Sequence, residues 1–135
     1  MKFATWIVRG FGTVNKKSMV RNIIREEGLD IIGLTETKHQ EITRWDMKKC
    51  WGNQEVDWMH VTARQGSGGL VISWKQAAFT LSNSIAMSRW VCVIGMVQEI
   101  QTPCAFCLVY APSNHQERLV VWDQLRAIKV GFGVP

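Results

Sequence analysis

A glutamate close behind a run of apolar residues is the most informative candidate for chemistry in this sequence. Residues 29–34 (LDIIGL) have the composition of a strand that is buried on both faces, and Glu36 follows shortly after them. In α/β sheets, ligands and reactive groups gather beyond the carboxyl ends of the strands. A carboxylate is also the hard oxygen ligand that Mg²⁺ prefers. Taken alone, a glutamate in such a loop is usually a solvated side chain, so the elements around Glu36 decide its meaning.

A second pattern with possible chemistry is the Cys-x-x-Cys pair formed by Cys104 and Cys107, which is typical of zinc or redox sites. A tetrahedral zinc site needs two further ligands, and the sequence has no second pair of this kind and no HxxxH. Residues 105–110 are predicted to form a strand, where positions three apart point to opposite faces. Arg9 ends the first apolar stretch early, which argues against a secretory signal. We therefore expect an intracellular protein whose cysteines are buried, structural and reduced.

The elements that position Glu36 begin with a strand–helix–strand unit. Residues 2–8 form a β-rich run, and glycines at 10 and 12 mark a loop. Residues 15–27 carry apolar side chains at helical spacing, and Gly28 stands where a helix commonly ends. Residues 29–34 then form the second strand. Such a crossover places its two strands side by side and parallel.

The rest of the chain is predicted to be mostly strands. A short helix is expected at 40–50 and a last helix at 116–128; the strands between them are 56–61, 69–74, 79–84, 90–100 and 105–110. Turn residues separate the strands, which is typical of an antiparallel meander. Several strands are apolar on both faces and so belong to a sheet that is covered on both sides. Three helices can cover about one face, so we expect an exposed apolar sheet face. A partner polypeptide or a second sheet from missing sequence would cover it, or the product folds poorly.

Composition sets broad limits on function. The chain has 135 residues, 47% hydrophobic and 20% charged, which indicates one globular domain or part of one. Its net charge of +5 is compatible with binding to nucleic acid but does not establish it. No apolar run is long enough to cross a membrane. Seven tryptophans suggest base stacking, but Trp6, Trp74, Trp90 and Trp122 fall in predicted elements and are expected in the core.

An ordered series of short motifs connects these elements to a known family. The motifs are TWIVRGF at 5–11, DIIGLTETK at 30–38, GSGGLVISW at 66–74, SRWV at 88–91, VYAP at 109–112 and RLVVWDQL at 118–125. The series resembles the endonuclease/exonuclease/phosphatase superfamily. More narrowly, it is similar to the apurinic-type endonuclease domain of LINE (non-LTR) retrotransposons from plants. There the corresponding stretches are roughly WNVRGLG, DIIxLQETK, SGGLxxxW, and VYGP followed by RxxxWxxL.

The resemblance implies a four-layer α/β fold with two sheets packed face to face. It also implies hydrolysis of phosphate esters with Mg²⁺ or Mn²⁺, which neutralises phosphate charge while a base activates water. The glutamate of the ETK motif is Glu36, which becomes a metal ligand. The catalytic-site tyrosine of the family is Tyr110, near the substrate phosphate. Arg9, Lys38 and Asn114 are expected at the same sheet edge, in contact with substrate.

Departures from the family pattern bear on activity. The asparagine of the WN motif is Ile7 here, which can neither donate nor accept a hydrogen bond, and the glutamine of QETK is Thr35. The chain stops where the family's GDFN block should begin. The family also has a later aspartate–histidine pair that supplies the general base. This pair has no counterpart here, because His39, His60 and His115 do not match the position of its histidine.

These observations lead to one fold prediction. We expect residues 1–135 to be a partial α/β domain, truncated before the GDFN block. It would form the N-terminal half of a four-layer α/β sandwich, with one mixed sheet flanked by helices and the second sheet missing.

Three functional hypotheses follow. The leading one is a truncated Mg²⁺-dependent DNA endonuclease domain of retroelement origin that is inactive alone, with DNA as its partner and no membrane. A second is a non-catalytic nucleic-acid-binding module that uses four cations of the first helix: Lys16, Lys17, Arg21 and Arg25. A third is a pseudogene product without a selected function.

Overall fold

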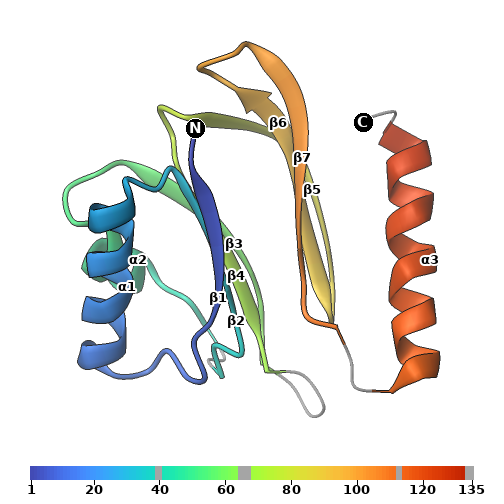
Figure 1. Cartoon of the computed structure of the whole chain (residues 1–135), viewed down its shortest axis with the longest axis horizontal. Helices are drawn as coiled ribbons and strands as arrows, with labels where there is room; N and C mark the ends of the chain where they lie inside the picture. Colours follow the sequence, from blue (N-terminus) through green and yellow to red (C-terminus); the bar gives the residue numbers. More distant parts are fainter. Residues whose placement is uncertain (39–40, 64–67, 112–113, 133–135) are drawn as a thin grey trace.

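The chain folds as four stacked layers in the order helix, sheet, sheet, helix (Figure 1). The structure is a computed structural model that describes residues 1–38, 41–63, 68–111 and 114–132. The bounds of the ten elements are β1 Phe3–Ile7, α1 Val14–Glu27, β2 Ile31–Thr35, α2 Arg44–Trp51, β3 Val56–Val61, β4 Leu70–Lys75, β5 Phe79–Met87, β6 Trp90–Val97, β7 Thr102–Val109 and α3 His115–Phe132. None of the described helices has the length and apolar character to cross a membrane.

The first sheet has the strand order β1-β2-β4-β3 and is covered on its outer face by α1 and α2 (Figure 1). β1 and β2 are parallel, which confirms the crossover predicted from the sequence. β4 is antiparallel to both β2 and β3. β1 and β2 therefore end at the same edge of the sheet, which is the edge where Glu36 lies.

The second sheet has the strand order β5-β6-β7 and is antiparallel throughout, as the meander predicted. Its outer face carries α3, which packs through Val121, Leu125 and Ile128 on Trp90 and Cys92. Trp122 is 52% exposed, so its expected place in the core is wrong.

The prediction of a missing second sheet and an exposed apolar sheet face is wrong. The turn after β4 passes the chain from one sheet to the other, and the two inner faces pack together. Ile72 and Trp74 of the first sheet share one buried cluster with Val91, Val93 and others of the second. At Gly33, an added Cβ atom would lie 2.7 Å from Leu108 Cδ1, so the sheets approach closely there. Strands that are apolar on both faces are explained by this sandwich.

The cysteines also differ from expectation. Cys92 and Cys107 lie opposite one another on β6 and β7, with their Cα atoms 4.1 Å apart, and form a disulfide. Directly opposed residues on adjacent antiparallel strands point to the same face, which brings the two sulfurs within bonding distance. The expectation of reduced thiols is therefore wrong for this pair. Cys104 is free and faces the inner cluster, which confirms that it and Cys107 point to opposite faces. The Cys-x-x-Cys pair therefore does not act as one unit.

Candidate functional site

Three loops meet at the edge where β1 and β2 end, and backbone hydrogen bonds hold them together. The N–H of Gly10 donates to the carbonyl oxygen of Glu36 at 2.7 Å, and that of Phe11 donates to Thr37 at 2.8 Å. The N–H of Lys38 donates to the carbonyl of Gly68 at 2.6 Å. The loops after β1 and β2 and the residues before β4 are thereby fixed to one another around Glu36.

The backbone at this edge is strained at three side-chain-bearing positions. Arg9, Glu36 and Lys38 have φ angles of 53°, 55° and 56°. This left-handed conformation costs roughly 1–2 kcal/mol for a residue with a Cβ atom. Such strain gathers at functional sites, where the surrounding structure enforces it. All three residues were predicted from the sequence to be site residues, and the fold places them in adjoining loops.

Glu36 is held closely by its neighbours. A Cβ atom added at Gly68 would lie 3.0 Å from the Cα and 3.2 Å from the Cγ of Glu36, so only glycine fits beside it without displacement. On either side of Glu36, the buried hydroxyl oxygens of Thr35 and Thr37 have no hydrogen-bond partner among the described residues. Burial of a hydroxyl without a partner is costly. Thr35 was identified from the sequence only as a departure from the QETK motif, and Thr37 was not identified. The polar TETK run directly after an apolar strand could have indicated both as site residues.

An open groove of about 640 Å³ separates the edge strands β1 and β7 at the same end of the sandwich. Tyr110, Thr35 and Ile7 all line it, so the structure brings the predicted tyrosine to the strand end that carries Glu36. The N–H of Tyr110 donates to the carbonyl oxygen of Arg89 at 2.8 Å, and the Arg89 guanidinium lies 5.9 Å from the Tyr110 ring centroid. Arg89 adds a cation that sequence analysis did not single out, although the SRWV motif contains it.

Asn114 has a structural role at the start of α3. Its side-chain oxygen accepts hydrogen bonds from the N–H groups of Gln116 at 2.8 Å and Glu117 at 3.2 Å. This is helix capping, in which a side-chain oxygen satisfies free N–H groups of the first turn. The side-chain oxygen of Asn114 is therefore already engaged, and its predicted contact with substrate stays a prediction.

The donor set does not fit a resident divalent metal held by this chain alone. No group of three or more His, Cys, Asp or Glu side chains lies together within the described ranges. Ile7, at the position of the family's asparagine, offers no ligand atom in the groove. Glu36 contributes one carboxylate, whereas magnesium sites commonly combine carboxylates with substrate phosphates.

The histidines are spread over the fold. His60 lies on β3 and lines a recess with Thr62 and Met87. His115 is the first residue of α3. His39 lies outside the described residues, as do Gly66 and Ser67 of the glycine-rich run at 66–69.

The basic face predicted on α1 is smaller than expected. Lys17 is buried, and its ammonium lies 3.4 Å from the Asp46 carboxylate of α2. It therefore joins the two helices and is not a free cation for nucleic acid. Arg21 and Arg25 are exposed, and Lys16 is half-buried. The hypothesis of a binding module counted Lys17 among the cations available to nucleic acid, but the packing of α2 against α1 buries it.

Comparisons with solved structures show the fold. The chain matches AP endonuclease LMAP of Leishmania major at 18% identity and a TM-score of 0.58, covering 87% of this chain and 42% of that one. It matches TDP2 of Caenorhabditis elegans at 13% identity and a TM-score of 0.60, covering 96% of this chain and 43% of that one. An endonuclease/exonuclease/phosphatase family protein of Bacteroides thetaiotaomicron matches at 12% identity and a TM-score of 0.62, covering 96% and 57%.

The chain thus spans about half the length of the solved structures that it matches. No protein-family model matches its sequence, and no curated protein is detectably similar to it. At these identities the matches establish the architecture and not the activity.

Proposed function

We propose that this chain, which has the endonuclease/exonuclease/phosphatase fold, is a DNA phosphodiesterase-type domain of LINE-retrotransposon origin that is not an efficient nuclease alone. The observation that carries the proposal is the setting of Glu36. It is held in a strained backbone conformation at the sheet edge of a nuclease fold, between adjoining loops that contain Arg9 and Lys38. The retroelement origin rests on the ordered motif series from TWIVRGF to RLVVWDQL.

The site supports contact with DNA phosphate better than its hydrolysis. Arg9 and Lys38 are exposed at the edge. The Arg89 guanidinium lies 5.9 Å from the centroid of the Tyr110 ring and is paired with the Glu117 carboxylate at 3.5 Å. Cations of this kind neutralise backbone phosphates, and a tyrosine hydroxyl can donate a hydrogen bond to a phosphate oxygen. In related enzymes a divalent metal supplies charge neutralisation, but here the Glu36 carboxylate belongs to no group of three or more potential metal ligands among the described residues.

Binding of duplex DNA tests the substrate-contact part of the proposal. Fluorescence anisotropy of a labelled 20-base-pair duplex would compare the wild type with Arg9→Ala and Lys38→Ala between low and moderate salt. Each phosphate contact contributes about −0.9 to the slope of log K against log[salt]. Loss of one contact should therefore make the slope less negative by about one unit in each variant. Lys75→Ala, at the opposite end of β4, is the matched control and should leave the slope unchanged. Equal slopes for all four proteins would contradict phosphate contact at this edge.

A further inference from the structure

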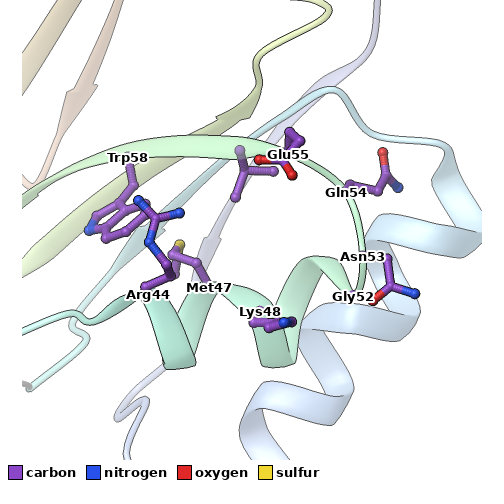
Figure 2. A pocket seen from close by; sticks show the side chains of 9 residues that line it. Arg44, Met47, Lys48, Gly52, Asn53, Gln54, Glu55 and Trp58 are labelled. Carbon is purple, nitrogen blue, oxygen red and sulfur yellow. The ribbon is translucent and has the colours of Figure 1, made fainter.

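A polar pocket of about 360 Å³ lies between α2 and the beginning of β3, in the helical layer of the sandwich (Figure 2). Arg44, Met47 and Lys48 of α2 form one side of it. Trp58 of β3 and the connecting loop with Asn53 and Gln54 form the rest. The functional-site loops contribute nothing to it, so it is a separate place on the molecule.

The pocket contains a preformed flat surface. The Arg44 guanidinium lies 5.3 Å from the centroid of the half-buried Trp58 ring, and Figure 2 shows the two groups together at one end of the pocket. Arginine planes and indole rings are the surfaces on which unpaired nucleobases stack, whatever the base. Met47 adds an apolar wall next to this pair.

Positive charge surrounds the same pocket. No ion pair is found for Arg44 or Lys48 among the described residues. A third cation, Arg21, lies beside the lining residue Gly52, because a Cβ atom added at Gly52 would be 3.3 Å from Nη2 of Arg21. Glu55 is the one carboxylate of the lining residues, so the cations outnumber it. A ligand with negative charge is therefore favoured.

Polar groups that could distinguish ligands lie on the connecting loop. Asn53 and Gln54 are exposed, and each amide offers both donors and an acceptor. Amides of this kind can hydrogen-bond the edge of a base. A flat stacking surface, free cations and amides together suit a ligand that has a planar ring joined to a phosphate.

We propose that this pocket binds a nucleotide, with its base against the Arg44–Trp58 pair and its phosphate near Lys48 and Arg21. The nucleotide is either free or one unit of a single strand, since both present the same chemistry. A duplex is excluded as the preferred ligand because its bases are already paired and stacked. The proposal is independent of nuclease ancestry, since it uses neither Glu36 nor the groove beside Tyr110.

Competition binding on the full chain tests the proposal. The probes are a fluorescein-labelled 12-nucleotide single strand of mixed sequence, the matching duplex, and unlabelled AMP as competitor. Trp58→Leu keeps an apolar side chain but removes the flat ring, and Lys48→Gln removes one exposed charge. Trp122→Leu, an exposed tryptophan on α3, is the matched control. Far-ultraviolet circular dichroism would verify that each variant is folded.

The expected result is about tenfold or greater loss of single-strand affinity in Trp58→Leu, because stacking contributes on that scale. Lys48→Gln should weaken binding several-fold, whereas Trp122→Leu should leave it unchanged. Displacement of the strand by AMP would identify a free nucleotide as a sufficient ligand; failure of AMP to compete would identify a strand segment. Absence of single-strand binding, equal loss in Trp58→Leu and Trp122→Leu, or duplex binding that weakens as much as single-strand binding in Trp58→Leu would overturn the proposal. If Trp58→Leu does not fold, Lys48→Gln alone decides the outcome.

Discussion

The backbone N–H of Gly10 donates a 2.7 Å hydrogen bond to the carbonyl oxygen of Glu36, so the loop after β1 fixes the loop after β2. Glu36 therefore cannot relax from its positive φ angle without breaking this contact. The same two loops carry Arg9 and Lys38 in the same conformation. The conformation that places these charged side chains therefore lowers local stability at this edge.

Glycine at position 36 should be more favourable to stability than alanine. Glycine adopts a positive φ without steric cost, whereas alanine keeps the strain, and the higher entropy of unfolded glycine offsets part of this gain. We expect Glu36→Gly to be about 0.5–1 kcal/mol more stable than Glu36→Ala in urea unfolding. Gln101, with a φ of 50° in the turn before β7, is the control, and its Gly and Ala variants should differ similarly. Equal stability of the two Glu36 variants would show that the backbone there is not strained.

Loss of the charge on Lys17 should destabilise the fold strongly. Lys17 and Asp46 are both buried, and the Asp46 carboxylate also accepts from the N–H of Thr43 at 2.9 Å to cap α2. Removing one partner leaves a buried charge without compensation, at a cost of about 3 kcal/mol. We expect Lys17→Met to lose this amount in urea unfolding and exposed Lys48→Met to change by less than about 0.5 kcal/mol. A loss below about 1 kcal/mol for Lys17→Met would contradict the importance of the pair.

The disulfide should contribute to stability under oxidising conditions. Cys92 and Cys107 close a loop with a sequence separation of 15 residues. A cross-link of that length stabilises a protein by about 3 kcal/mol through restriction of the unfolded chain. Addition of a thiol reductant should therefore lower the melting temperature of the wild type and of Cys104→Ser, but not that of Cys92→Ala/Cys107→Ala. An unchanged wild-type melting temperature would show that the two sulfurs are not bonded.

Stability should also fall in alkaline solution because of Cys50. Burial raises the pKa of the Cys50 thiol from 9.0 to about 12; the nearby Lys17 opposes this rise and Asp46 adds to it. Between these pH values the unfolded thiol releases its proton and the folded one keeps it. Ionisation of Cys50 therefore does not affect the free energy of unfolding below about pH 9. Above that pH it lowers the free energy of unfolding by up to about 1.4 kcal/mol per pH unit.

Urea unfolding at pH 8 and pH 10.5 checks this effect. Cys50→Ala should lose less stability between the two pH values than the wild type, although it starts lower because of the cavity that it creates. Cys104→Ala, at a partly buried free cysteine, serves as the comparison. Parallel losses in wild type and Cys50→Ala would refute the assignment.

Local patterns in the sequence predicted most of the elements but not how the sheets divide. The helical spacing of Val20 and Ile24, and Gly28 at the end, placed α1 within a residue of its observed start. The apolar run before Glu36 predicted β2 and its parallel neighbour. The division into two sheets depends on the turn after β4 that redirects the chain, and no local pattern determines that direction.

Residues of the site that follow strand ends could be predicted from the sequence, whereas contacts between packed elements could not. Glu36, Arg9 and Lys38 follow strand ends, so their common edge follows from the crossover. The Arg44–Trp58 contact and the burial of Lys17 depend on how α2 packs against β3 and α1. Side chains that meet across such packed elements leave no spacing signal in a single sequence.

Nicking of supercoiled plasmid DNA in the presence of Mg²⁺ or Mn²⁺ tests whether this chain alone is inactive as a nuclease. The wild type and Glu36→Ala would be compared over a time course, with a protein-free reaction as the background. Because Glu36 belongs to no group of three or more His, Cys, Asp or Glu side chains among the described residues, we predict nicking at the background rate for both proteins. Metal-dependent nicking by the wild type that is lost in Glu36→Ala would contradict the account and show that this chain is a nuclease by itself.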